Sequence, residues 1–221
     1  MKKLIYALWL LGFAILVPCG LKAQDDAVLR QTGPQIAVVP FQAILPVDHS
    51  SSTVQCPVCG NVHSSGSIAK GAEKIVEDIF VDQLSRLKNV EVVPQERASA
   101  VYRRIAADSL KKTVLQVVQK TGQELRVDYI VVGFVYRYKE RIGYNYSAER
   151  PASVTYEIHL ISVKDGKSIW RGAYDKTQKS LMEDVFQASS FLKGGARWVT
   201  ARQLAKLGID EIMATFPELE K

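Results

Sequence analysis

The chain has 221 residues, of which 47% are hydrophobic and 24% charged, and its formal net charge is +6. This length and composition exclude a disordered chain and fit one sizeable domain. Lys2, Lys3 and Lys22 carry half of the net charge, and the rest is spread along the chain without a basic patch, so the sequence predicts no nucleic-acid partner.

The first segment, residues 1–23, is typical of a secretory signal peptide. Lys2 and Lys3 form its basic start, and residues 4–17 follow as an uncharged apolar run. That run is shorter than the roughly 20 residues that span a bilayer, which favours a signal over a membrane anchor. The sequence therefore predicts export, with the mature chain facing the periplasm.

Two interpretations of the end of this signal stay open. In the first, the signal is cleaved after Ala23, a small residue at the position of an ordinary cleavage site. In the second, Cys19 is lipidated, although Pro18 departs from the pattern of a lipoprotein signal. The first interpretation predicts a free periplasmic protein. The second predicts a protein anchored to the outer membrane by an N-terminal lipid.

The mature chain begins with a polar lead-in, residues 24–35, which we expect to be flexible and to precede a single domain over residues 36–221. Residues 36–41 form a short apolar run, which predicts a buried strand. Residues 42–70 follow and are rich in serine, proline and glycine. A loop of this length is uncommon in a compact domain and is usually functional or cross-linked by a metal or a disulfide.

Helices dominate the next part of the chain. Apolar side chains at three- and four-residue spacing predict an amphipathic helix over residues 71–87. A short strand is predicted over residues 90–93, and it should be parallel to the first strand because a helical crossover returns the chain in the same direction. Two more helices are predicted over residues 95–107 and 110–125.

Three strands and a helical tail complete the predicted domain. Residues 127–138 form a strongly apolar strand, and Gly133 within it indicates the close approach of a neighbour. Residues 153–163 alternate between apolar and polar, and residues 168–176 return after an Asp-Gly turn. The tail over residues 180–217 is predicted to be helical. These elements predict an α/β (α+β) fold with a mixed sheet flanked by helices.

Three segments, residues 36–41, 127–133 and 160–170, follow a recognisable order. The first is an opening apolar strand, the second an Asp-Tyr-apolar-apolar-apolar-Gly step, and the third a hairpin with a Gly-Lys-x-x-Trp return. Together they resemble the TolB amino-terminal domain and the CsgG-like bacterial envelope lipoproteins. The resemblance implies a TolB-like fold and a non-enzymatic role in an envelope assembly or transport complex, with other envelope proteins as partners.

The sharpest local signal is a Cys-Pro-Val-Cys-Gly segment that contains Cys56 and Cys59, with His49 before it and His63 after it. This is the form of a zinc knuckle, and structural zinc takes four nitrogen or sulfur ligands, so these four residues are the candidate ligands. Export to an oxidising compartment favours a Cys56–Cys59 disulfide over zinc. Redox activity is the third interpretation, and it is disfavoured because no helix begins at this segment.

The remaining polar residues do not form a catalytic arrangement. His159 lies on the polar face of its predicted strand, where we expect a solvated residue. The sequence has no phosphate loop and no Gly-x-Ser-x-Gly elbow. We therefore expect no enzyme and no cofactor other than zinc, and predict an accessory or scaffold component of the envelope. The alternative is a redox or zinc-dependent protein that uses the loop of Cys56 and Cys59.

Overall fold

The computed structural model describes residues 33–48, 51–109, 111–144, 148–178 and 198–220. All of them belong to Gln31–Lys221, the larger of the two units into which the chain divides. The predicted signal with both of its candidate ends, His49, and residues 180–197 of the predicted tail lie outside the described residues. Within the described part, no helix is long and apolar enough to cross a bilayer.

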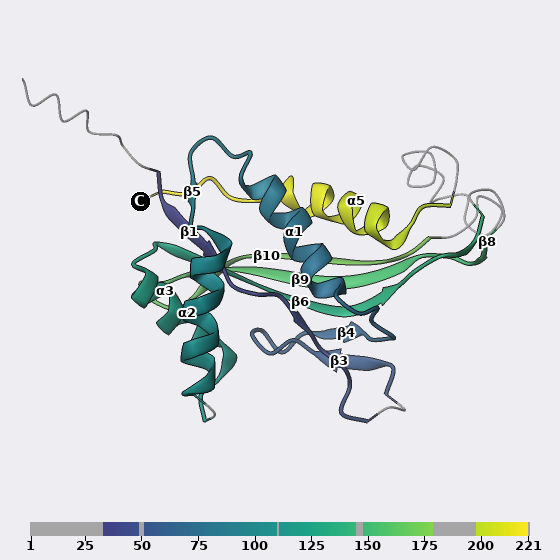
Figure 1. Ribbon diagram of the computed structural model, residues 1–221, viewed down its shortest axis with the longest axis horizontal. Coiled ribbons are helices and arrows are strands. Elements are labelled where there is room, and N and C mark those ends of the chain that lie inside the picture. The colour runs from purple at the N-terminus through teal and green to yellow at the C-terminus, as the bar shows by residue number, and fades with distance from the viewer. Residues whose placement is uncertain (1–32, 49–50, 110, 145–147, 179–197, 221) are drawn as a thin grey trace, which may run out of the picture. The chain divides into compact units, whose positions relative to one another are not determined.

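A mixed sheet forms the centre of this unit (Figure 1). Its strands are β1 (Gln35–Val38), β2 (Gln42–Ala43), β5 (Glu91–Val92), β6 (Tyr129–Lys139), β9 (Ser153–Ser162) and β10 (Ser168–Thr177). Their order is β10-β9-β6-β1-β5, and β2 pairs with β6. β1 is parallel to β5 and β6, whereas β9 is antiparallel to β6 and β10. The predicted α/β fold class with a mixed sheet is thus confirmed.

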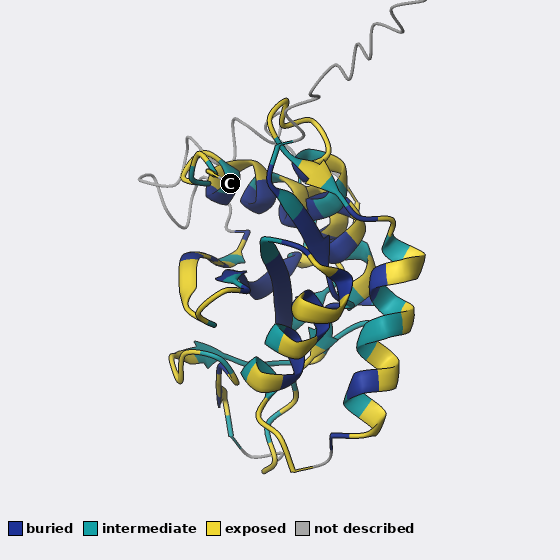
Figure 2. Ribbon diagram, turned by 90° about the vertical axis from the view of Figure 1, so that its left-hand side faces the viewer, coloured by how far each residue is buried: buried dark blue, intermediate teal, exposed yellow. Residues whose placement is uncertain are grey.

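Helices cover both faces of the sheet (Figure 1). Those described are α1 (Ala72–Leu84), α2 (Gln95–Ala107), α3 (Val114–Leu125) and α5 (Ala201–Met213). α1 and α5 pack with one apolar cluster, and α2 and α3 pack with a second cluster on the opposite face. Figure 2 shows buried strands between helices whose outer faces are exposed. The apolar stripes of the helices thus face the sheet, as their periodicity predicts.

The start of α3 differs from the prediction, because the helix begins at Val114 rather than at residue 110. Thr113 caps it: its Oγ1 accepts a hydrogen bond from Gln116 N at 3.3 Å, and Gln116 Oε1 accepts one from Thr113 N at 3.0 Å. This reciprocal pair satisfies two backbone donors that have no partner inside the helix. It therefore fixes the first helical residue.

The predicted loop over residues 42–70 is not a plain connection. It contains β2 and a two-stranded hairpin, β3 (Thr53–Gln55) and β4 (Val62–Ser64). Val54 of β3 is buried, and it belongs to the same apolar cluster as α2, α3 and the second face of the sheet. The hairpin therefore covers the part of this face that the two helices leave uncovered (Figure 1).

β9 is buried on both faces, which corrects the expectation that His159 is solvated. Thr155, Glu157 and His159 alternate with apolar residues, yet each is 0% exposed. The reason is the hairpin, which lies over the polar face of β9. A buried carboxylate and a buried imidazole require partners, since an unpaired buried charge is costly. These partners define the candidate site.

Candidate metal centre

The turn between β3 and β4 brings two cysteines to the sheet. Cys56 N donates a hydrogen bond to Asn61 O at 2.8 Å, and Gly60 N donates one to Cys56 O at 2.9 Å. Gly60 has a φ of 74°, a left-handed conformation that glycine adopts without steric cost. Val58 N also donates to Cys56 Sγ at 3.4 Å. Backbone donors of this kind stabilise a thiolate, and this turn is what a metal-binding knuckle requires.

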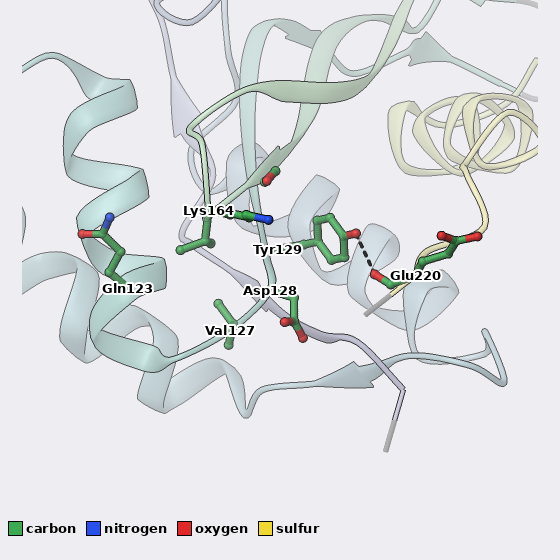
Figure 3. A pocket seen from close by; sticks show the side chains of 8 residues that line it. Gln123, Val127, Asp128, Tyr129, Lys164 and Glu220 are labelled. Carbon is green, nitrogen blue, oxygen red and sulfur yellow. Dashed lines mark hydrogen bonds between the residues drawn. The ribbon is translucent and has the colours of Figure 1, made fainter. Parts of the chain in front are cut away.

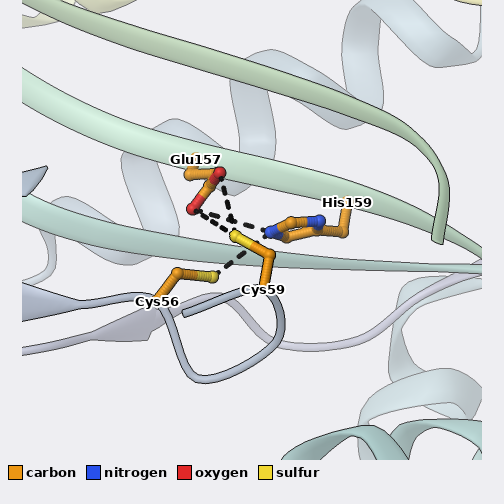
Figure 4. A group of neighbouring side chains, drawn as sticks. All are labelled: Cys56, Cys59, Glu157 and His159. Carbon is orange, nitrogen blue, oxygen red and sulfur yellow. Dashed lines mark hydrogen bonds and ion pairs between the residues drawn. The ribbon is translucent and has the colours of Figure 1, made fainter. Parts of the chain in front are cut away.

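Two hairpin residues and two β9 residues converge beneath this turn (Figure 4). Cys56 Sγ lies 3.3 Å from His159 Nε2, and Cys59 Sγ lies 3.6 Å from Glu157 Oε1. Glu157 Oε2 lies 3.6 Å from His159 Nε2. All four ligand atoms are within 4.8 Å of one another. The group therefore offers two sulfurs, one nitrogen and one carboxylate oxygen to a common point.

The spacing of these atoms matches the edges of a zinc tetrahedron. Zinc binds sulfur at about 2.3 Å and nitrogen or oxygen at about 2.0–2.2 Å, so the edges of its tetrahedron are about 3.3–3.8 Å long. With Glu157 Oε2 as the carboxylate ligand, the Cys56–His159, Cys59–Glu157 and Glu157–His159 pairs are 3.3–3.8 Å apart, and the ligand atoms of all four residues lie within 4.8 Å of one another. A zinc ion would therefore need only small shifts of these side chains.

The imidazole of His159 is oriented from its far side. Its Nδ1 lies 3.1 Å from Ser168 Oγ, and the same hydroxyl donates to Trp170 O at 3.3 Å. With its own proton committed to Trp170 O, the hydroxyl accepts from Nδ1–H. On binding a metal, His159 would give up the proton on Nε2, and its lone pair would then point at the side of the cysteines. Metal-binding histidines are commonly held in this way through their second nitrogen.

The carboxylate of Glu157 has three further partners. Tyr136 OH donates to its Oε2 at 3.2 Å, and His63 Nε2 lies 2.8 Å from the same oxygen. Arg171 Nε donates to its Oε1. The His63 ring also stacks on the Tyr136 ring, with 4.6 Å between their centroids. These contacts fix both carboxylate oxygens in position beneath the hairpin.

Electrostatics keep this carboxylate ionised. Burial alone would raise the pKa of Glu157, but hydrogen bonds from His159, Arg171 and Cys56 outweigh it and hold the pKa well below its usual range. The pKa of His159 is raised, because its contacts with Cys56 and Glu157 outweigh the opposing effect of burial. The hydrogen bond to Glu157 also raises the pKa of Arg171. The group is thus a buried acidic site with a cationic neighbour.

The charge count suits a divalent cation. Two thiolates and one carboxylate carry three negative charges, so the site with a bound zinc ion would have a net charge of −1. Arg171 would offset this charge. Thiolate and imidazole ligands favour zinc over magnesium or calcium, which prefer oxygen. The donor set, the spacing and the charge therefore all fit zinc.

Only two of the four residues predicted as metal ligands, Cys56 and Cys59, belong to the converging group. Cys56 and Cys59 both point to the centre, whereas His63 contacts Glu157 and is not one of the converging ligands. His49 lies outside the described residues. Glu157 and His159 are the partners that sequence reasoning missed. An available signal was the Glu-x-His pair on the polar face of an otherwise apolar strand.

Both cysteines are free thiols in the structure, Cys56 buried and Cys59 exposed. Their side chains point to His159 and Glu157 (Figure 4). The predicted disulfide between them stays a prediction.

A separate cavity of about 560 Å³ lies where β6 begins and β9 ends (Figure 3). Asp128, Tyr129, Lys164 and Glu220 are among its lining residues. Its polar groups already bind within the chain: Asp128 accepts from Gln35 N at 2.8 Å, and Tyr129 OH donates to Glu220 O at 2.8 Å. This cavity therefore offers fewer groups to a ligand than the cysteine site does.

Comparisons with known proteins find low-scoring matches among solved structures. No family model and no curated protein matches the chain. PelC of Paraburkholderia phytofirmans, solved as a dodecamer, is 13% identical with a TM-score of 0.45 over 83% of this chain and 86% of that one. Lipoprotein GNA1162 of Neisseria meningitidis is 13% identical with a TM-score of 0.41 over 74% and 98%. The LpoB C-terminal domain of Salmonella enterica is 14% identical with a TM-score of 0.37 over 66% and 84%.

At these identities and TM-scores the likeness carries no argument about function. The resemblance to TolB and to CsgG-like proteins stays a prediction. The functional conclusion rests on the residues of this chain.

Proposed function

We propose that the chain is a non-enzymatic, periplasm-facing module of the cell envelope whose cysteine-bearing hairpin is fixed to its sheet by a structural zinc ion. The observation that carries this proposal is the convergence of Cys56, Cys59, Glu157 and His159 within 4.8 Å. Two of these ligands come from the hairpin and two from β9, so one ion would join segments about a hundred residues apart.

A structural role fits the site better than a catalytic one. Structural zinc sites are closed by four protein ligands, whereas catalytic sites keep a position for water or substrate. Here four protein ligands converge, and Cys56, Glu157 and His159 are at most 3% exposed. Cys59 is the exposed member and forms the outer side of the group. Such a centre would hold the hairpin in one position rather than process a substrate.

The envelope role is supported by the sequence. The signal-like segment over residues 1–23 predicts export, and lipidation of Cys19 would add anchoring to the outer membrane. The fixed hairpin would present Val62, which is 61% exposed, as part of a contact surface for another envelope protein. A rigid surface loses less conformational entropy on binding than a mobile loop does.

The test is metal content after purification under reducing conditions, measured by elemental mass spectrometry. We expect one zinc ion per chain, and near-complete loss of zinc in His159→Gln. His63→Gln is the matched control, because it removes an imidazole from the same cluster without removing a converging ligand. It should retain zinc. Zinc loss in His63→Gln with retention in His159→Gln would contradict the proposed ligand set, and absence of zinc in the wild type would contradict the proposed function.

A further inference from the structure

We infer that Cys56 and Cys59 form a redox modification site, in which a peroxide converts the zinc-bound pair into a disulfide, expels the ion and detaches the hairpin turn from the sheet. The inference rests on the proposed zinc centre and adds the regulation of that centre. It also resolves the competition between zinc and a disulfide, because the same two sulfurs would serve both.

Zinc and a disulfide would connect different parts of the chain. Zinc would bind Cys56 and Cys59 on the hairpin and Glu157 and His159 on β9, so it would cross-link the hairpin to the sheet. A Cys56–Cys59 disulfide would cross-link the turn only to itself. Oxidation would therefore leave both sulfurs bonded and still remove the attachment. The two remaining ligands, both on β9, would hold zinc weakly, because a stable structural site needs four.

The geometry permits this exchange. The two sulfurs already lie within 4.8 Å of each other, and a disulfide requires about 2.05 Å. Cys59 is exposed, so it is the sulfur that a dissolved oxidant reaches first. The next residue, Gly60, is exposed, and no atom lies within 4 Å of the position that its Cβ would take. The backbone on this side of the turn is therefore not packed against a neighbour there.

The reaction balances with hydrogen peroxide as the oxidant. The Cys59 thiolate attacks one peroxide oxygen, the O–O bond breaks, and the departing hydroxide takes a proton and leaves as water, which gives a sulfenic acid. The Cys56 thiolate then attacks the Cys59 sulfur, and the second hydroxide leaves as water after taking another proton. In total, two thiolates lose two electrons, peroxide gains them, two protons are consumed, and zinc is released as a divalent cation.

Loss of the ion should loosen the turn but not the whole hairpin. Ser64 Oγ still donates to Asp175, and Gly66 N still donates to Tyr136 O at 3.1 Å. Val54 stays packed in the apolar cluster of that face. The expected change is therefore confined to the turn, residues 56–61, whereas β3 and β4 stay paired and β9 and β10 keep their pairing.

The experiment uses the full chain with Cys19→Ser, so that Cys56 and Cys59 are its only thiols. The zinc-loaded protein is treated with hydrogen peroxide while zinc release, free thiols and hydrogen exchange are followed. We expect one zinc released for every two thiols lost, and exchange over the turn, residues 56–61, that is roughly tenfold faster. Exchange over residues 168–177 should not change. A dithiol reductant with added zinc should reverse all three effects.

Two controls separate disulfide formation from general damage. Cys59→His keeps a zinc ligand but cannot form the disulfide, so peroxide should not release its zinc. Wild-type protein stripped by a chelator shows the exchange rate of the metal-free, reduced hairpin, which the oxidised protein should match. Zinc retained after both thiols are lost, or zinc released without faster exchange over residues 56–61, would overturn this inference alone. A protein that binds no zinc before oxidation would instead overturn the proposed function.

Discussion

Replacing Arg171 with methionine should destabilise the zinc-free protein more than the zinc-bound protein. Arg171 Nε donates to Glu157 Oε1, and the exposed fractions of the two side chains are 43% and 0%. Removing one partner of a buried ion pair costs about 3–5 kcal/mol. Solvent screens the exposed guanidinium, and His63 still contacts the carboxylate at 2.8 Å. We therefore expect a loss of about 2 kcal/mol in the free energy of unfolding without zinc.

Bound zinc should reduce this loss to less than half, because the ion itself would neutralise the carboxylate. Thermal unfolding of Arg171→Met, with a chelator and with saturating zinc, measures both values. For a chain of this size, about 2 kcal/mol corresponds to a decrease of about 4–8 °C in Tm.

The matched control is Lys167→Met, which removes a positive charge near the same strand pair. Lys167 is 79% exposed and lies 3.6 Å from Asp165, so its ion pair should contribute no measurable stability. Equal destabilisation of Arg171→Met in both metal states would refute the reasoning. Without zinc, a decrease in the Tm of Arg171→Met no larger than that of Lys167→Met would refute it too.

Three further predictions concern packing, a helix cap and the signal. Gly133→Ala would place its Cβ 2.5 Å from a ring carbon of Phe41, so the free energy of unfolding, measured with denaturant, should fall by about 1–3 kcal/mol. Adding Phe41→Leu to the same chain should recover part of this loss. An unchanged denaturant midpoint in Gly133→Ala would disprove the contact. Thr113→Ala removes the cap of α3 and should lower the free energy of unfolding by about 1 kcal/mol in the same assay. An unchanged value would show that the cap does not stabilise the protein. Cys19→Ser should move a lipidated protein from the membrane fraction to the soluble fraction, whereas a wild type that is already soluble would support cleavage after Ala23.

Local sequence patterns predicted much of the fold, because they depend on neighbours along the chain. The helix predicted over residues 95–107 coincides with α2. The Asp-Gly turn and the alternation around it predicted the β9–β10 hairpin. Gly133 indicated the close approach of a neighbour, and the structure identifies that neighbour as the ring of Phe41.

Half of the candidate site could not be predicted in this way. Cys56 and Cys59 are close in sequence, so the turn that joins them is visible as a motif. Glu157 and His159 are about a hundred residues away, and only the folded sheet places them beneath that turn. Alternation along β9 marks a polar face, but the same pattern fits a strand face covered by water and one covered by a hairpin. His159 was for that reason wrongly expected to be solvated.

X-ray absorption at the zinc edge of the purified, zinc-loaded chain tests the central claim most directly, because it measures the ligands of the ion itself. The proposed ligand set predicts a first shell of two sulfurs at about 2.3 Å, from Cys56 and Cys59, and two lighter atoms at about 2.0–2.2 Å, from Glu157 and His159. The imidazole scattering of His159 should be present in the wild type, and in His63→Gln the spectrum should match the wild type. A first shell of nitrogen and oxygen alone, or a spectrum altered by His63→Gln, would contradict the account.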